Sequence, residues 1–159
     1  MSLVLGMTAE LKLETRCENQ ISNEIDRTPA QPGDEMQVEA LIREHKKAIH
    51  RTRSSRKYNC HGLVFASRRS KIWDSAEVAK ILQEDNYVKI SPQGVLAGDV
   101  AIYFHEGDAQ HAGVVVEVFD NPKTTKILSK WGLMQEVIHM AYDVPPYYGT
   151  EIEYYRIKS

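Results

Sequence analysis

Residues 58–65 read YNCHGLVF, which places a single cysteine between a polar residue and the start of an apolar run. Asn59 is a favourable helix N-cap, because its side-chain oxygen can accept a hydrogen bond from a free amide of the first turn. A helix that begins there would hold the Cys60 thiol at the positive end of the helix dipole, where a thiolate is stabilised. We therefore expect Cys60 to be a reactive cysteine of low pKa at the start of a short buried helix, over residues 60 to about 67.

The composition is that of one globular domain with a proper core. The chain has 159 residues, of which 42% are hydrophobic and 26% charged, as in ordinary soluble domains. A net charge of −2 provides no overall positive field, so we expect neither a nucleic-acid partner nor an anionic membrane surface. No apolar run reaches 18 residues, and the sequence therefore predicts no transmembrane helix.

The beginning of the chain differs from the rest. Residues 1–34 are polar and weakly patterned, and they end in TPAQPGD at 28–34, which is typical of a loop or linker. We expect residues 1–34 to be a polar arm or linker, of poor order or loosely placed, and residues 35–159 to be the folded domain. The first seven residues lack the basic start of a secretory signal. This predicts a cytoplasmic protein, while a secreted or delivered form whose leader was removed stays open.

Helical patterns occupy the first half of the domain. Apolar positions keep helical spacing over residues 35–49, and a capping-box pattern at 74–77 opens a second helix that should end near Asn86. Between them, the basic run at 50–57 reads as a solvated loop. Because that run directly precedes Cys60, it could also bring positive charge to a thiolate or to an anionic substrate.

Strand patterns occupy the second half. We expect a short strand over 87–90 and, after residue 91, consecutive strands joined by turns at 105–110 and 121–123. The expected strands are 100–104, 111–119, 125–131, 136–140 and 151–157. Helices followed by consecutive strands indicate an α+β domain, with the N-terminal helices packed on an antiparallel sheet.

A nucleophilic cysteine needs a nearby base and a third group that orients the base. His111 is the best candidate base because it opens the most apolar strand of the chain, where its backbone would be held rigidly. Cysteine and histidine can also bind metal, but the chain has no CxxC or HxxxH pair, and the acidic turn at 106–108 lacks the pattern of an EF-hand. We expect no metal and no other cofactor. The two cysteines, Cys17 and Cys60, are too few for a disulfide framework, although one bridge between them stays open.

Three segments in order resemble the NlpC-type papain-like cysteine peptidases and the related CHAP amidases. They are NCHGLV at 59–64, LAGDVAIY at 96–103 and HAGVVV at 111–116. The resemblance covers about residues 55 to 132. It implies a papain-like fold with the cysteine on a helix against a sheet that carries the histidine. It also implies an amide-bond hydrolase, often acting on cell-wall peptides, with Cys60 as nucleophile and His111 as general base. The Cys60 amide would then be a plausible oxyanion donor.

The third catalytic member departs from these families. Ser129 or Lys130 falls where they place a histidine, asparagine or glutamine. A serine hydroxyl can accept a hydrogen bond from an imidazole, whereas a lysine ammonium cannot and would instead lower the thiol pKa or bind a carboxylate. We expect Ser129 to orient His111, with His139 as the second candidate.

The substrate follows less directly from the sequence. Tyr58, Lys130 and Trp131 are the candidates for substrate contacts, and the substrate would be a peptide or a peptidoglycan-like compound. The alternative is a non-catalytic binding module that keeps the papain-like fold and uses the cleft for recognition. The unusual third member favours this alternative, and the intact Cys60 and His111 oppose it.

Overall fold

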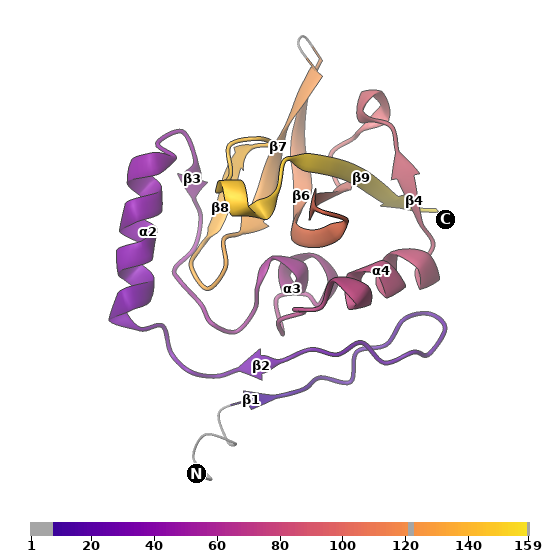
Figure 1. Cartoon of the computed structure of the whole chain (residues 1–159), viewed down its shortest axis with the longest axis horizontal. Helices are drawn as coiled ribbons and strands as arrows, with labels where there is room; N and C mark the ends of the chain where they lie inside the picture. Colours follow the sequence, from indigo (N-terminus) through magenta and orange to yellow (C-terminus); the bar gives the residue numbers. More distant parts are fainter. Residues whose placement is uncertain (1–7, 121–122, 159) are drawn as a thin grey trace.

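Strand-forming residues dominate the second half of the chain, and they build one large sheet (Figure 1). The computed structural model describes residues 8–120 and 123–158. In these residues three helices pack on a seven-stranded antiparallel sheet, so the expected α+β class is confirmed. The first seven residues, and the turn expected at 121 and 122, lie outside the described residues.

The strands follow the predicted order closely. Their order in the sheet is β3-β8-β7-β6-β5-β9-β4, and every neighbouring pair is antiparallel. The short strand β3 was not expected, and β6 begins three residues earlier than predicted. The bounds are β3 (Ile49–His50), β4 (Tyr87–Ile90), β5 (Val100–His105), β6 (Asp108–Asp120), β7 (Lys123–Lys130), β8 (Glu136–Met140) and β9 (Glu151–Ile157).

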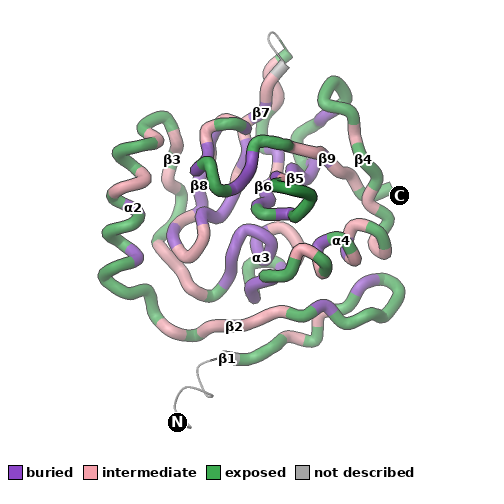
Figure 2. Tube along the Cα trace, in the orientation of Figure 1, coloured by how far each residue is buried: buried purple, intermediate pink, exposed green. Residues whose placement is uncertain are grey.

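Side chains that alternate along the strands divide the core between the two faces of the sheet. On one face Ile102 and Ala112 pack with Val78 and Ile81 of the helix α4 (Ser75–Glu84). On the other face, buried residues of β5, β7 and β8 pack with Val38 of the helix α2 (Pro32–Glu44) and with the segment that precedes β9. Figure 2 shows the buried residues concentrated along the central strands and in the helix α3 (Cys60–Phe65) between them and the arm.

The helix α3 begins at Cys60, as the sequence predicts. The Asn59 side-chain oxygen accepts hydrogen bonds from the amides of Gly62, at 2.9 Å, and Ile72, at 3.1 Å. Gly62 is required here because a Cβ atom at this position would overlap the carbonyl oxygen of Ser70. The helix ends at Phe65, so it is shorter than expected, and it fixes the cysteine against the middle of the sheet.

The second segment of the family resemblance has a structural role. Asp99 is buried, and its carboxylate accepts hydrogen bonds from Arg156 at 2.7 Å on each oxygen and from the Leu96 amide at 2.8 Å. Gly98, which precedes it, has a φ of +97° that favours glycine. Asp99 therefore joins the start of β5 to β9, and it does not take part in the candidate site.

The N-terminal arm runs beneath α3 and α4 in the view of Figure 1 and forms the small sheet of β1 (Thr8–Ala9) and β2 (Ile25–Asp26). Ile21 is only 1% exposed and packs in the same core cluster as Val78. The amide of Ser22 donates a hydrogen bond to the carboxylate of Glu77 at 2.8 Å. Asp74 alone therefore caps α4, and the reciprocal capping box that the sequence pattern predicts does not form.

These contacts correct the expectation of a loose arm or linker over residues 1–34. The described part of the arm supplies core residues, and the expected boundary at 34 and 35 falls inside α2, which begins at Pro32. Proline is favourable at the first position of a helix because its missing amide has no partner there in any case. The sequence pattern at 28–34 thus ends in a helix start, because residues 32–34 belong to α2 while residues 28–31 lead into it. Among the described residues, no helix is long and apolar enough to cross a membrane.

Candidate active site

Cys60 is the first residue of α3 and is 6% exposed. The backbone amides of Ala112 on β6 and of His61 and Cys60 itself act to lower the pKa of its thiol. Lys130 adds a favourable positive charge from β7. The helix start and the sheet together therefore surround one sulfur atom with donors that could stabilise negative charge.

Burial nevertheless outweighs these donors and raises the pKa of the Cys60 thiol to about 11. This is opposite to the low pKa that the helix start predicts. The physical reason is that burial disfavours a thiolate. In addition, α3 has only six residues, so its dipole is small. The raised pKa favours the neutral thiol form of Cys60 at neutral pH.

A hollow of about 450 Å³ opens in front of Cys60. A volume of this size is typical of small-ligand sites. Its walls come from the start of α3, the segment before α4, the turn into β6, and the loops after β7 and before β9. The lining residues are Asn59, Cys60, His61, Trp73, Asp74, Ser75, Asp108, Ala109, Gln110, Gly132 and Tyr148.

His111 lies on β6 opposite Tyr103 and is fully buried. The ring of Tyr148 stacks on it at a centroid distance of 3.9 Å, and the Tyr103 ring meets it edge-on at 5.1 Å. Within the described part of the chain, neither ring nitrogen of His111 has a hydrogen-bond partner. The contact that we expected with Cys60 is therefore not formed as a hydrogen bond, and His111 does not line the hollow, although Tyr148 does.

Ser129 and His139 bind each other rather than His111. His139 donates from Nδ1 to the carbonyl of Met140 at 2.8 Å, so its Nε2 accepts from the Ser129 hydroxyl at 2.7 Å. Ser129 also accepts from the indole of Trp131 at 3.1 Å. The expectation that one of them orients His111 is wrong for this structure. Both side chains lie on the same face as His111, but the register pairs Ser129 with Gly113 and not with the histidine.

The predicted substrate contacts are also buried structural residues. The Tyr58 hydroxyl donates to Glu136, which forms a two-pronged ion pair with Arg68 at 2.7 and 3.0 Å. The Lys130 ammonium donates to the carbonyls of Ser55 and Gly132, each at 2.8 Å, and lies 4.9 Å from the centre of the Tyr58 ring. Neither residue lines the hollow.

Trp131 is 0% exposed and packs on the core face of the sheet, so it is likewise no substrate contact. Sequence position alone suggested the tyrosine, the lysine and the tryptophan because they are neighbours of the expected catalytic residues. Burial, which depends on the whole fold, assigns them to the interior. Lys130 keeps one functional connection: burial lowers the pKa of its ammonium to about 8, and its charge faces the sulfur of Cys60.

Sequence reasoning missed the exposed residues of the hollow. Trp73 is 59% exposed at its rim, and Asp74 and Asp108 add two exposed carboxylates. Tyr148 comes from the single-turn helix η2 (Pro146–Tyr148), far along the chain from Cys60. No local pattern marks these positions, because the hollow exists only where segments that are distant in the sequence meet.

The described residues include no group of three or more His, Cys, Asp or Glu side chains placed to hold a metal ion. The two cysteines do not form the disulfide that was left open, since Cys17 is free and exposed on the arm whereas Cys60 is free and buried.

The burial of three histidines predicts how the free energy of unfolding changes at acidic pH. Burial lowers the pKa of His61 and of His139 to about 4, and it lowers the pKa of His111 well below its ordinary value. In the unfolded chain these rings bind protons near pH 6.5, which the folded protein does not. Stability is therefore full above about pH 6.5 and falls as the pH falls below it, by about 1.4 kcal/mol per pH unit for each ring.

Urea unfolding between about pH 7 and about pH 4.5 measures this slope, and we expect an uptake of more than one proton on unfolding. The paired carboxylates, such as Asp99, have lowered pKa values and lose their stabilising effect only at more acidic pH. A stability that stays constant between pH 7 and 4.5 would show that the three rings are not buried as described.

Comparison of the chain with protein-family models, with curated proteins and with solved structures found no match.

Proposed function

We propose that this protein is a cysteine-dependent hydrolase of peptide or isopeptide amide bonds, with a papain-like fold of the NlpC and CHAP type. One observation carries the proposal: Cys60 begins the helix α3 and borders a hollow of about 450 Å³, and the backbone amides of Ala112, His61 and Cys60 favour the ionised form of its thiol. Amides in this arrangement can bind the oxyanion of a tetrahedral intermediate. A nucleophile, candidate oxyanion donors and room for a substrate thus occur together around Cys60.

The charge states favour a general-base mechanism over a preformed ion pair. Both the thiol and the imidazole of His111 are neutral at rest. In the proposed reaction His111 takes the thiol proton as the sulfur attacks the carbonyl carbon. The carbon–nitrogen bond then breaks, and the leaving amine takes that proton from the imidazolium. Water, again deprotonated by His111, attacks the thioester, which releases the acid and restores the thiol.

The reaction needs a closer approach of the thiol and the imidazole than this structure has. The Cys60 side chain would turn toward β6, or Tyr148 would shift from its stack on His111, when a substrate enters the hollow. Catalytic hydrogen bonds are commonly long without substrate and shorten when it binds. The His111 nitrogens have no hydrogen-bond partner among residues 8–120 and 123–158, so they are available to receive the proton.

The rim of the hollow indicates the kind of peptide. Trp73 is 59% exposed, and the ammonium of Lys71 lies 5.5 Å from the centre of its ring, so this ring already accepts one cation. Asp74 and Asp108 offer carboxylates, and no lysine or arginine of the described chain lines the hollow. Aromatic faces and carboxylates together suit an amino or other cationic group. We therefore propose a peptide substrate that carries a positive charge close to the cleaved amide.

The second candidate function is a non-catalytic binding module of the same fold. It is favoured by the raised pKa of Cys60 and by the missing hydrogen bond to His111. In that case the hollow would bind the same cationic peptide without cleaving it. The two functions differ in whether a substrate brings the thiol into reaction.

A pair of electrophiles tests this difference. Iodoacetamide, which needs only an exposed thiolate, should label the exposed Cys17 faster than the buried Cys60 at neutral pH. A lysine-containing peptidyl electrophile should instead label Cys60, because the bound peptide positions its reactive carbon beside the sulfur. Intact-protein mass spectrometry with Cys17→Ala and Cys60→Ala as matched variants assigns each product.

Turnover of fluorogenic lysine-containing peptide amides completes the test. We expect Cys60→Ala to lower the rate by about 10⁴-fold or more, as for other removed nucleophiles, and Cys17→Ala to retain it. If peptides bind in the hollow but neither cleavage nor labelling of Cys60 occurs, the binding module is the correct function. Binding can be followed by the fluorescence of Trp73, which lines the hollow.

A further inference from the structure

A second and larger cavity lies away from Cys60, between the N-terminal arm and the basic loop before α3. Its volume is about 650 Å³, and it shares no lining residue with the hollow of the candidate active site. One wall is the arm at residues 25–30, and the other is the loop at residues 54–57 together with Arg69. The cavity thus exists only because the arm packs on the domain.

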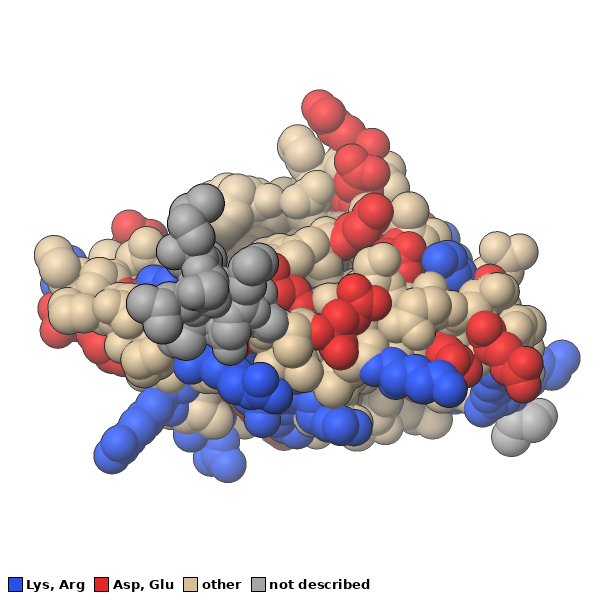
Figure 3. All heavy atoms as spheres, turned by 90° about the horizontal axis from the view of Figure 1, so that it is seen from below, with Lys and Arg blue, Asp and Glu red and all other residues tan. Residues whose placement is uncertain are grey.

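The lining of this cavity is strongly cationic. It contains Arg27, Arg56, Lys57 and Arg69 and a single carboxylate, Asp26, although the whole chain has a net charge of −2. Figure 3, which views the face of the arm, shows lysines and arginines gathered along one side of it. Such a concentration of one charge is local and is not a consequence of overall composition.

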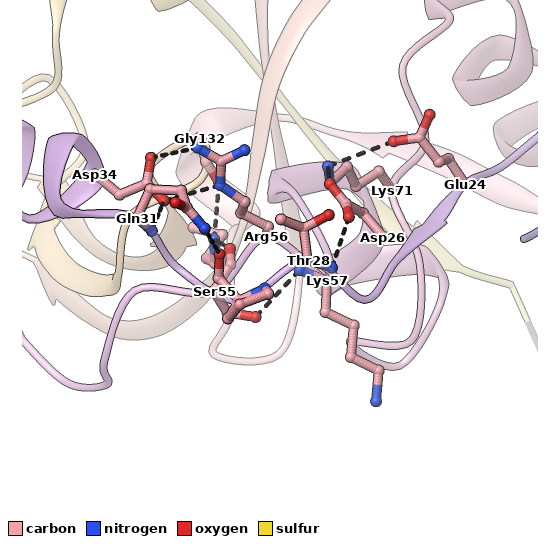
Figure 4. A network of polar contacts seen from close by, with 12 residues as sticks. Glu24, Asp26, Thr28, Gln31, Asp34, Ser55, Arg56, Lys57, Lys71 and Gly132 are labelled. Atoms are coloured by element: carbon pink, nitrogen blue, oxygen red, sulfur yellow. Dashed lines mark hydrogen bonds and ion pairs between the residues drawn. The ribbon is translucent and has the colours of Figure 1, made fainter. Parts of the chain in front are cut away.

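The carboxylates near the cavity are already neutralised by other cations. Asp34 holds Arg56 through two bonds, of 2.9 and 3.0 Å, and Asp26 accepts from the buried Lys71 at 3.1 Å (Figure 4). Among the residues that the structure describes, no ion pair involves the exposed cations Arg27, Lys57 and Arg69. Three positively charged residues of the lining therefore have no ion-pair partner in the described chain.

Uncharged groups complete the lining. The hydroxyl of Ser54 is buried and has no hydrogen-bond partner in the described chain, and Thr28 supplies a second hydroxyl group to the wall. Leu11, Ile25 and Pro29 form an apolar side. A buried hydroxyl without a partner is unfavourable unless a ligand or water satisfies it. The cavity thus combines cations, an available hydroxyl and an apolar wall.

We propose that this cavity binds an organic phosphate of nucleotide size. Arginines bind phosphate oxygens in a two-pronged way that suits their planar side chains, and three uncompensated cations match a ligand of two or more negative charges. The apolar wall would contact the organic part of the ligand. An open cavity with a volume near 650 Å³ fits a small molecule, whereas a nucleic acid would need a basic track along the surface.

The cavity also has a rigid frame. The bonds of Asp34 to Arg56 and of Lys71 to Asp26 fix the two walls before any ligand arrives (Figure 4). The carbonyl of Ser55, a lining residue, accepts the bond from Lys130, whose charge faces Cys60. One buried lysine thus binds a lining residue of this cavity and acts electrostatically on the Cys60 thiol, but phosphate binding does not depend on hydrolase activity.

Isothermal titration calorimetry of the full chain tests the proposal with ATP, AMP, inorganic pyrophosphate and adenosine as probes, at about 150 mM salt to screen nonspecific attraction. We expect ATP and AMP to bind, pyrophosphate to bind more weakly than ATP, and adenosine not to bind. The variant Arg27→Gln/Lys57→Gln/Arg69→Gln should weaken ATP binding by about tenfold or more, since it removes charge-assisted bonds.

The matched control is Arg43→Gln/Lys46→Gln/Lys47→Gln, which removes three exposed cations near the end of α2 that do not line the cavity. Its affinity for ATP should stay within about twofold of the wild type, because distant exposed charges are screened. The proposal is overturned if no phosphate probe binds, or if the control weakens binding as much as the cavity variant. Tighter binding of a short single-stranded oligonucleotide than of ATP would overturn it in favour of a nucleic-acid partner.

Discussion

Deletion of residues 1–31 is expected to destabilise the protein by about 5 kcal/mol or more, which is comparable to the whole stability of many domains. Ile21 and Ile25 are buried by the fold, and each contributes about 2–3 kcal/mol on the scale of buried apolar area. The deletion also removes Glu24 and Asp26, the two carboxylates that pair with the buried Lys71. An unpaired buried cation is strongly unfavourable.

Circular dichroism and urea unfolding measure the effect, with expression in the soluble fraction as a first indication. Two point variants separate core packing from the arm's length: Ile21→Ala should cost about 2–5 kcal/mol, whereas Lys12→Ala, whose side chain is 84% exposed, should cost little. A truncated protein that unfolds cooperatively with unchanged stability would restore the idea of a dispensable arm.

The arm could not be recognised from the sequence because its contacts are irregular. Its buried residues, Thr15, Ile21 and Ile25, follow neither a helical nor a strand period, since the chain crosses the helices as an extended segment. Its polar side chains and backbone bind carboxylates at the far ends of α4, more than fifty residues away. Judged by its composition alone, such a segment has the character of a polar linker. The few apolar positions of the arm can be recognised as core residues only once the helices that they pack on are known.

The sheet was predictable for the opposite reason. Residues 100–104 and 111–119 alternate or run apolar over whole strands, and consecutive strands with short turns pair as antiparallel neighbours. The start of α3 was predictable too, because Asn59 caps it through a local hydrogen bond. Local signals therefore placed Cys60 and the strand of His111 correctly.

The surroundings of these two residues could not be read in the same way. Tyr148, which stacks on His111, comes from a segment 37 positions later, counting from 111 to 148. The pKa of Cys60 depends on burial, which is a property of the complete fold, and burial outweighs the local effect of the helix start. Patterns of residue types predict elements well, whereas the charge state of a site depends on what packs over it.

His111 gives the sharpest expected contrast between stability and function. Its two ring nitrogens are buried without partners, which disfavours the folded state because water satisfied them in the unfolded chain. Replacing the imidazole by an apolar group of similar size removes that penalty. We therefore expect His111→Leu to raise the free energy of unfolding by about 1–3 kcal/mol at neutral pH. We also expect it to abolish turnover, since the proposed base is gone.

The matched control is His139→Leu, which should have the opposite effect on stability. His139 uses both nitrogens, one with Met140 and one with Ser129, so its loss leaves a buried hydroxyl without an acceptor. We expect a loss of about 1–3 kcal/mol. Urea unfolding and peptide turnover of both variants, with His111→Phe as a second variant that retains a ring against Tyr148, make the comparison.

Each outcome separates one cause from another. A stabilised and inactive His111→Leu means that the unpaired imidazole is kept for its chemistry, because selection for stability alone would favour the leucine. A stabilised variant that still cleaves peptides removes His111 from the mechanism while leaving Cys60 in place. If both apolar variants destabilise the protein as much as His139→Leu does, the imidazole has a structural partner in solution, and the proposed general base must be sought among the other groups that border the hollow.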